Sequence, residues 1–237
     1  AGAERLVPLL EEEDRQIANE VPREFKHIES IDFKHVWFSY DNNDVYALKD
    51  FTLSIKAGEF IGIVGPSGSG KSTLLSLLMG LYKPTKGAIY INGIDIANYD
   101  SSVLRHLMGY VFQQAYLFKG SIKDNLTLFD TSISYDDMVA AAKQVNLDSM
   151  IEQLPEGYHT PVGYLGSLLS DGQKQLLAFG RTLIRNTPIL LLDEATANID
   201  SHTEKQIQAS IENIRGSKTI VSIAHRLSTV QDANKIV

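Results

Sequence analysis

Hydrophobic and polar positions alternate early in the chain. The stretches "IESIDFKHVWFSY" and "YALKDFTLSI" alternate, and "AIYING" (88–93) does so as far as an Asn-Gly pair. Alternation of this kind is typical of strands with one buried face. It predicts three antiparallel strands, with "NND" (42–44) as the turn between the first two and the Asn-Gly pair as a second turn.

Three later apolar runs do not alternate. "FIGIVG" (60–65), "ILLLDE" (189–194) and "TIVSIAH" (219–225) are continuous, and each ends in polar residues. Continuous runs are typical of strands buried on both faces of a parallel sheet. Ligands of open α/β sheets bind beyond the C-terminal ends of the strands, so these polar tails are candidate site residues.

Helical periodicity fills much of the remaining chain. Residues 123–186 are mostly helical in pattern, as in "SYDDMVAAAKQVNLDSMIEQL". A further helix is predicted to begin after Ser170, because Gln173 stands where a capping box takes Glu or Gln. Strands and helices in this order predict an α/β fold.

The two ends of the chain differ from its centre. Residues 1–24 read as a short amphipathic helix and an acidic linker closed by Pro22, so we expect 1–27 to be a linker and 28–237 the main domain. The chain stops within "ANKIV", which reads as another strand. We therefore expect a fragment cut at both ends.

Composition narrows the possible functions. The net charge of −7 over 237 residues argues against a basic nucleic-acid-binding surface, and residues 1–24 alone hold seven acids and three bases. There is no cysteine, so disulfides and thiolate metal sites are impossible. No apolar run approaches the roughly 20 residues of a membrane span, and no signal peptide is visible. Any link to a membrane is expected to lie outside this chain.

The stretch "GPSGSGKST" carries the first chemical motif. It follows an apolar strand and precedes the apolar helix "LLSLLMGLY", which is the context a P-loop requires. Its glycines let backbone N–H groups turn toward phosphate oxygens, its lysine neutralises the β and γ phosphates, and its first hydroxyl after the lysine is a Mg²⁺ ligand. The candidate residues are Gly65, Pro66, Ser67, Gly68, Ser69, Gly70, Lys71, Ser72 and Thr73.

Two acids end the run "ILLLDE". Asp193, at the end of a buried strand, suits a metal ion bound with the phosphates. Glu194 is expected near the γ phosphate, where it could act as a general base toward a water molecule.

With these motifs the chain resembles the nucleotide-binding domain of an ABC transporter, over about residues 28–237. The P-loop, "YVFQQAYLF", "LSDGQKQ", "ILLLDEATANID" and "SIAHRL" occur in the family's order. The resemblance implies a P-loop NTPase core with a parallel sheet flanked by helices, an antiparallel β subdomain and a helical signature subdomain at about 115–186. It implies ATP and Mg²⁺ as cofactors and ATP hydrolysis coupled to transmembrane transport.

The resemblance also assigns roles beyond the P-loop. It implies that Tyr40 stacks on adenine, and that Gln113 contacts Mg²⁺ and the attacking water. Asp193 becomes the second metal ligand and Glu194 the catalytic base. Asp200 matches the loop acid that communicates across a dimer, and His225 matches the switch histidine that contacts the γ phosphate.

In this family each nucleotide lies between one chain's P-loop and the opposite chain's signature helix. The resemblance therefore implies a second ABC ATPase domain as partner, contacted through Ser170, Gly172 and Gln173. The tail "AGAERLVPLLEEED" and the segment "LFKGSIKDNL" resemble those of exporters, whose transmembrane domain is fused N-terminally. This places the domain at the cytoplasmic face of the plasma (inner) membrane.

Two positions depart from the family pattern. Tyr164, in Gly163 to Gly166 "GYLG", replaces an acid proposed to relay movement to the transmembrane part. The usual LSGGQ signature is here LSDGQ, with Asp171 in the first helical turn. An outward carboxylate would favour the helix by about 0.3–1 kcal/mol, whereas one about 5 Å from a phosphate would repel it by roughly 3 kcal/mol at an effective dielectric near 20. We favour the second alternative, in which this chain forms an asymmetric heterodimer; a homodimer is the other.

Other functions fit the sequence less well. A soluble ABC ATPase of the DNA-repair or chromosome type has a long coiled-coil insertion, but only 96 residues separate Ser72 from Leu169, without sustained heptads. A nucleotide-sensing module without turnover is disfavoured by the presence of Glu194 and His225. A GTPase is a poor fit, because "NKIV" lacks the aspartate of the guanine-reading pattern.

Overall fold

The structure, a computed structural model, describes residues 27–41, 45–195, 199–224 and 229–237. The predicted N-terminal helix and linker, the "NND" turn and His225 lie outside these ranges. The chain divides into two compact units, one of residues 1–57 and 66–108 and the other of residues 58–65 and 109–237. Each unit is described by itself.

The first unit is built on a four-stranded antiparallel sheet in the order β2-β1-β4-β5. Its strands are β1 (Ser30–Phe38), β2 (Leu48–Lys56), β4 (Lys86–Ile91) and β5 (Ile94–Asp95). β1 pairs with both β2 and β4, and β4 turns into β5 through the predicted Asn-Gly pair, whose two residues have positive φ. The three strands predicted from alternation are therefore confirmed.

Helices complete the first unit. α2 (Lys71–Leu78) is the helix predicted after the P-loop; it begins three residues earlier, at the lysine of the motif, and buries its four leucines. A short 3₁₀ turn, η2 (Ile96–Asn98), leads to α3 (Ser101–Leu107), which Asp100 caps through its side chain. Gly80 lies so close to α3 that an added Cβ would come within 2.9 Å of Leu104.

The second unit holds a five-stranded sheet in the order β6-β7-β8-β3-β9. The three continuous apolar runs form its centre, and they pair in parallel as predicted. The terminal "ANKIV" forms β9, which pairs in parallel with β3. The strands are β3 (Phe60–Ile63), β6 (Met108–Val111), β7 (Ile189–Asp193), β8 (Thr219–Ile223) and β9 (Lys235–Ile236).

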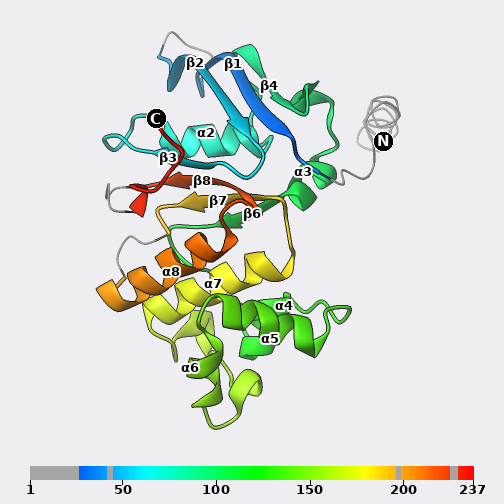
Figure 1. Cartoon of the computed structure of the whole chain (residues 1–237), viewed down its shortest axis with the longest axis vertical. Coiled ribbons are helices and arrows are strands. Elements are labelled where there is room, and N and C mark those ends of the chain that lie inside the picture. The colour runs from blue at the N-terminus through cyan, green and yellow to red at the C-terminus, as the bar shows by residue number, and fades with distance from the viewer. Residues whose placement is uncertain (1–26, 42–44, 196–198, 225–228) are drawn as a thin grey trace, which may run out of the picture. The chain divides into compact units, whose positions relative to one another are not determined.

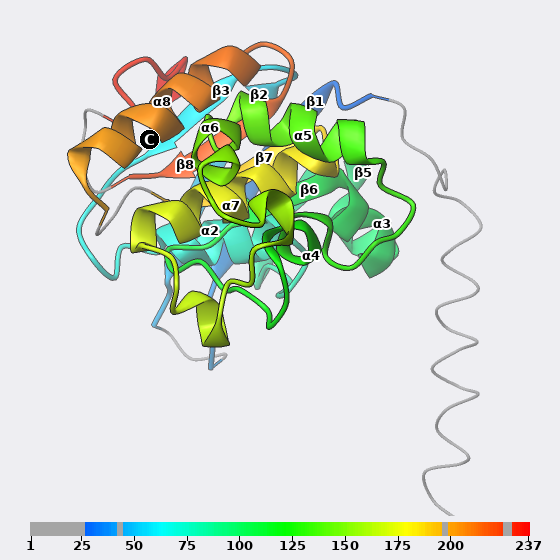
Figure 2. The same ribbon diagram turned by 90° about the horizontal axis from the view of Figure 1, so that it is seen from below.

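Helices of the second unit surround α7. Figures 1 and 2 show α7 between the strands and a group of shorter helices. The predicted helix after Ser170 is α7, and the segment 134–154, predicted to be helical, forms two helices separated at 145–147. The elements are α4 (Ile122–Thr127), α5 (Tyr135–Gln144), α6 (Asp148–Glu152), η3 (Gly157–His159), η4 (Tyr164–Gly166), α7 (Asp171–Ile184) and α8 (Ser201–Ile214).

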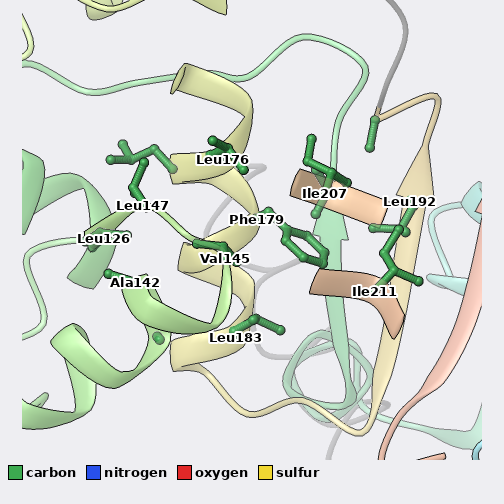
Figure 3. Packing of buried hydrophobic residues seen from close by; sticks show 14 of the residues in the cluster. Leu126, Ala142, Val145, Leu147, Leu176, Phe179, Leu183, Leu192, Ile207 and Ile211 are labelled. Carbon is green, nitrogen blue, oxygen red and sulfur yellow. The ribbon is translucent and has the colours of Figure 1, made fainter. Parts of the chain in front are cut away.

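The core of the second unit is packed around α7. Figure 3 shows Phe179 pointing from α7 toward Ile207 and Ile211 of α8, while Val145 lies on the opposite side. Gly180 faces the side of Val145, and an added Cβ there would lie 3.2 Å from Leu126, a tight contact. Burying each large apolar side chain stabilises the unit by about 1.5–3 kcal/mol. This packing fixes α7 as a rigid element, from which polar side chains reach the candidate site.

Candidate nucleotide-binding site

The end of the P-loop has a backbone that only glycine tolerates. Gly70 has a φ of 91° and is the N-cap of α2. A Cβ at Gly70 would lie 2.4 Å from the carbonyl oxygen of Ala47, just before β2. Gly70 places no side-chain cap on the N-terminus of α2, and a helix N-terminus at such a loop is suited to binding an anion.

Lys71 is held against its own loop. Its side chain is buried, and Nζ donates a hydrogen bond of 2.9 Å to the carbonyl oxygen of Pro66. The backbone N–H of Ser69 also donates to Pro66, over 3.2 Å. The ammonium group therefore lies across the concave side of the loop, where it can neutralise phosphate charge.

Tyr40 is joined to the helix that follows the P-loop. Its hydroxyl lies 2.8 Å from Oγ1 of Thr73, and its ring packs edge-on against Phe38 and Tyr82, with centroids 4.8 and 5.3 Å away. The residue remains 54% exposed. An aromatic ring that is fixed at its edges and exposed over half its surface is suited to stacking on a base.

The second unit brings two acids together with two residues from the β6 region. Asp193 ends β7, and its Oδ2 accepts a hydrogen bond of 2.7 Å from the Tyr110 hydroxyl. Glu194 follows with a φ of 50°, and its Oε2 accepts one of 2.6 Å from Nε2 of Gln113. A left-handed backbone conformation at a residue other than glycine is strained, and such strain clusters at functional sites.

Tyr110 is a residue that the sequence analysis did not single out. Burial, together with its hydrogen bond to Asp193, raises the pKa of its hydroxyl above the ordinary value of 10. The hydroxyl is therefore protonated at neutral pH and acts as a donor that fixes one oxygen of Asp193. Nothing in the stretch "GYVFQ" distinguishes this tyrosine from an ordinary strand residue.

The proposed metal donors fit Mg²⁺ by their chemistry. Asp193, Ser72 and Gln113 offer carboxylate, hydroxyl and amide oxygens, the hard donors that Mg²⁺ takes together with phosphate oxygens. In the structure the amide nitrogen of Gln113 donates to Glu194, so its amide oxygen points away from Glu194.

The signature segment opens α7 with a complete capping box. The Ser170 side chain accepts from the Gln173 backbone, and the Gln173 side chain accepts from the Ser170 backbone. The predicted cap is thus confirmed. Gly172 is required for close packing, because an added Cβ would lie 2.5 Å from Oγ1 of Thr203 in α8.

Asp171 lies beside a cation of its own helix. Its Oδ1 is 3.0 Å from Nζ of Lys174, and its side chain is 79% exposed. An exposed pair of this kind stabilises a helix by only about 0.2–0.5 kcal/mol. It nevertheless offsets part of the charge that Asp171 would present to a phosphate.

Asp200 caps α8. Its carboxylate accepts hydrogen bonds from the backbone of Thr203 and His202 and from the Thr203 hydroxyl. The bonds from Thr203 lower the pKa of Asp200 below its ordinary value. Since Thr203 also contacts Gly172, this acid is connected to the start of the signature helix through one side chain.

Two other positions singled out in the sequence are His225 and Tyr164. His225 lies outside the described residues, one position after the buried Ala224 that follows β8. Tyr164 is 79% exposed, at the start of η4. A cavity of about 240 Å³ in the first unit is lined by parts of 80–84 and 96–104, none of which is a predicted nucleotide ligand. The candidate site is therefore defined by its side chains rather than by this cavity.

Comparisons with known proteins identify the family. The ABC transporter family matches residues 48–197. A putative ABC transporter ATP-binding protein, exp8, from Streptococcus pneumoniae is 45% identical over 87% of this chain and 35% of its own length. A probable ABC transporter ATP-binding/permease protein from Haemophilus influenzae is 40% identical over the whole chain and 43% of its own length.

A solved structure resembles the chain closely. The structure of a bacterial Atm1-family ABC exporter with ATP bound matches with a TM-score of 0.85 and 40% identity, over 93% of this chain and 39% of that one. The chain belongs to the ABC transporter family, as an ATP-binding domain of exporter type. It spans less than half the length of these relatives. Within the described ranges, no helix is long and apolar enough to cross a membrane.

Proposed function

We propose that this chain binds ATP with Mg²⁺ and hydrolyses it, as the motor of a transporter. The observation that carries the proposal is the pair of short hydrogen bonds at the end of β7, where Tyr110 holds Asp193 and Gln113 holds Glu194. The same chain contains a complete P-loop, with Lys71 already lying across it.

Each residue then has a defined task. Backbone N–H groups from Gly65 to Thr73 and the Lys71 ammonium bind the phosphates, and Tyr40 stacks on the adenine. Mg²⁺, held by Ser72, Asp193 and Gln113, supplies charge neutralisation at the phosphates. Glu194 accepts a proton from the attacking water. Gln113 orients that carboxylate through its amide nitrogen, and we assign His225 to contact the γ phosphate.

A titration of the full chain tests this proposal. A fluorescent ATP analogue is added in Mg²⁺ and in EDTA, and phosphate release is followed separately. We expect binding that is strengthened by Mg²⁺ and lost in Lys71→Ala. Lys83→Ala is the matched control, since Lys83 is a cation of the same unit that follows α2 and lies outside the P-loop. Equal loss in both variants would contradict the assignment of Lys71.

We also propose that the chain works as a dimer with a second ABC ATPase domain. Ser170, Gly172 and Gln173 would contact the nucleotide held by the partner, and Asp200 would communicate across the interface. A transmembrane domain fused N-terminally would hold the assembly at the cytoplasmic face of the membrane. The relative from Haemophilus influenzae that is named a probable ATP-binding/permease protein supports the fused transmembrane domain.

Asp171 favours a non-identical partner. This chain keeps Lys71, Asp193, Glu194 and His225, but its signature helix presents a carboxylate where the family usually has glycine. Lys174 offsets that charge only in part, because the Asp171 side chain is 79% exposed. The partner would then carry an intact signature facing this chain's nucleotide, together with an altered base or switch histidine of its own.

Co-expression tests this second proposal. The full chain is produced alone and together with the product of a neighbouring transporter gene, and assembly and ATPase activity are measured. We expect efficient hydrolysis only in the mixed assembly, and a gain in activity of the chain alone on Asp171→Gly. A stable, fully active homodimer with two equal hydrolysing sites would rule out the asymmetric arrangement.

A further inference from the structure

The segment that carries Gln113 has few buried residues to hold it, although the Phe112 ring packs on Tyr110 with centroids 4.4 Å apart. β6 ends at Val111, and the next buried residue is Leu117. Between them, 112–114 and Tyr116 are exposed. An exposed stretch of this kind is ordered by its hydrogen bonds rather than by burial. Hydrogen bonds to its backbone therefore help to fix where Gln113 lies.

One such contact comes from the signature helix. Gln175 of α7 is 3% exposed, and its Nε2 donates a hydrogen bond of 2.9 Å to the carbonyl oxygen of Phe112. That carbonyl belongs to the peptide bond that leads into Gln113. Because residues two apart on a helix do not share a face, Gln175 points away from the capping position of Gln173.

A second contact holds the other end of the segment. Arg181, two turns further along α7, donates from Nη1 to the carbonyl oxygen of Tyr116 over 3.0 Å. Its Nε donates to the carbonyl oxygen of Asn125 over 2.8 Å, and its guanidinium lies 5.7 Å from the Phe118 ring centroid. Burial lowers the pKa of Arg181 to about 10, which leaves it charged at neutral pH.

We propose that Gln175 is a positioning residue for Gln113, acting through the Phe112 carbonyl, with Arg181 as the second anchor of the segment. α7 thereby connects two functions. Its N-terminus carries the signature residues that would face the partner's nucleotide, and Gln175, one turn further, sets the amide that is hydrogen-bonded to Glu194 over 2.6 Å. A movement of the signature helix would be transmitted directly to the side chain beside the catalytic base.

This role predicts a selective defect. It rests on the proposed function, because it is Mg²⁺-dependent nucleotide binding that Gln113 serves. Gln175→Leu keeps the size of the side chain but removes the donor. Residues that orient metal ligands typically change metal affinity about 10- to 100-fold. Gln175 acts one residue further away, so we expect a change of about 3- to 10-fold, smaller than that effect.

The readout is the Mg²⁺ enhancement of nucleotide binding by the full chain, defined as the dissociation constant of a fluorescent ATP analogue in EDTA divided by that in Mg²⁺. Gln175→Leu is expected to leave the EDTA value unchanged and to lower the enhancement. Gln175→Glu, which replaces the donor by an acceptor, should lower it at least as much. Thr182→Val is the matched control, because Thr182 is also buried in α7 and, among the described residues, its hydroxyl bonds within its own helix, to the carbonyl of Phe179.

A double-mutant cycle with Gln113→Ala separates positioning from general damage. If Gln175 acts through Gln113, then Gln175→Leu has no further effect in the Gln113→Ala background, whereas independent changes add. Additive losses, equal losses in EDTA and Mg²⁺, or the same loss in Thr182→Val would each overturn the inference. A wild-type chain without any Mg²⁺ enhancement would instead overturn the proposed function.

Discussion

Replacing Glu194 by glutamine removes the proposed general base and little else. The amide has the shape of the carboxylate, so the strained backbone at φ 50° and the hydrogen bond from Gln113 can both persist. It cannot accept a proton from water at neutral pH. We expect ATP binding to remain and hydrolysis to be nearly abolished, which would trap an ATP-bound dimer.

The expected magnitude separates two effects of this substitution. Loss of a general base costs about 10²- to 10⁴-fold in rate, or roughly 2.7–5.4 kcal/mol of activation free energy. The Gln113 bond changes from a charged to a neutral acceptor, a loss of about 1–1.5 kcal/mol. That smaller term corresponds to only about a tenfold change in an equilibrium or rate. The base term should therefore dominate.

Steady-state phosphate release from the assembled transporter measures the effect. Glu156→Gln is the matched control, because it makes the same change of charge at an exposed position after α6. It should leave the rate unchanged. A Glu194→Gln rate near that of the wild type, or lowered only about tenfold, as expected from the hydrogen bond alone, would refute the assignment of Glu194 as the base.

Three other predictions follow from the first unit and from α8. Tyr40→Ala should weaken nucleotide binding by roughly 1–3 kcal/mol in a titration, while Tyr40→Phe, which loses only the bond to Thr73, should weaken it less; equal losses would refute stacking. Gly70→Ala should abolish nucleotide binding and lower the thermal midpoint, because the φ of 91° and the nearby carbonyl leave no room for a Cβ; unchanged binding would contradict the loop geometry. The free energy of unfolding should fall as the pH drops below 3.8, through the lowered folded-state pKa of Asp200. Below pH 3.8 the unfolded chain protonates this carboxylate more readily than the folded chain does, because the folded carboxylate is held by its capping bonds. Asp200→Asn should therefore reduce this acid dependence.

The main strands were predictable because their hydrophobic patterns differ in kind. Alternation identified β1, β2 and β4, and continuous runs identified β3, β7 and β8, since burial on one face or on two leaves different periodicities. The cap at Ser170 was equally clear, because both partners of a capping box lie within four residues. β6 and α8 were not predicted: β6 is a strand of only four residues, and α8 directly follows "ANID", whose residues indicate chemistry rather than a helix.

The candidate site was predictable only in its motif residues. Lys71, Asp193 and Glu194 carry their chemistry in the side chain, so spacing and flanking strands identify them. Tyr110 and Gln175 do not, because each acts by donating one hydrogen bond to a residue 83 or 63 positions away. A tyrosine in a strand and a glutamine in a helix have no local pattern that indicates such a partner.

The sequence by itself determined the family, the phosphate loop and the departure at Asp171, because these depend on which residues stand at fixed local spacings. Only the tertiary structure decided what those residues contact. It placed Lys174 against Asp171 and the Thr203 side chain against Gly172. It also placed the carbonyl before Gln113 against α7. The last two contacts join segments distant in the chain and are selected by packing around α7. The Asp171–Lys174 pair depends instead on which rotamers two side chains of one helix adopt.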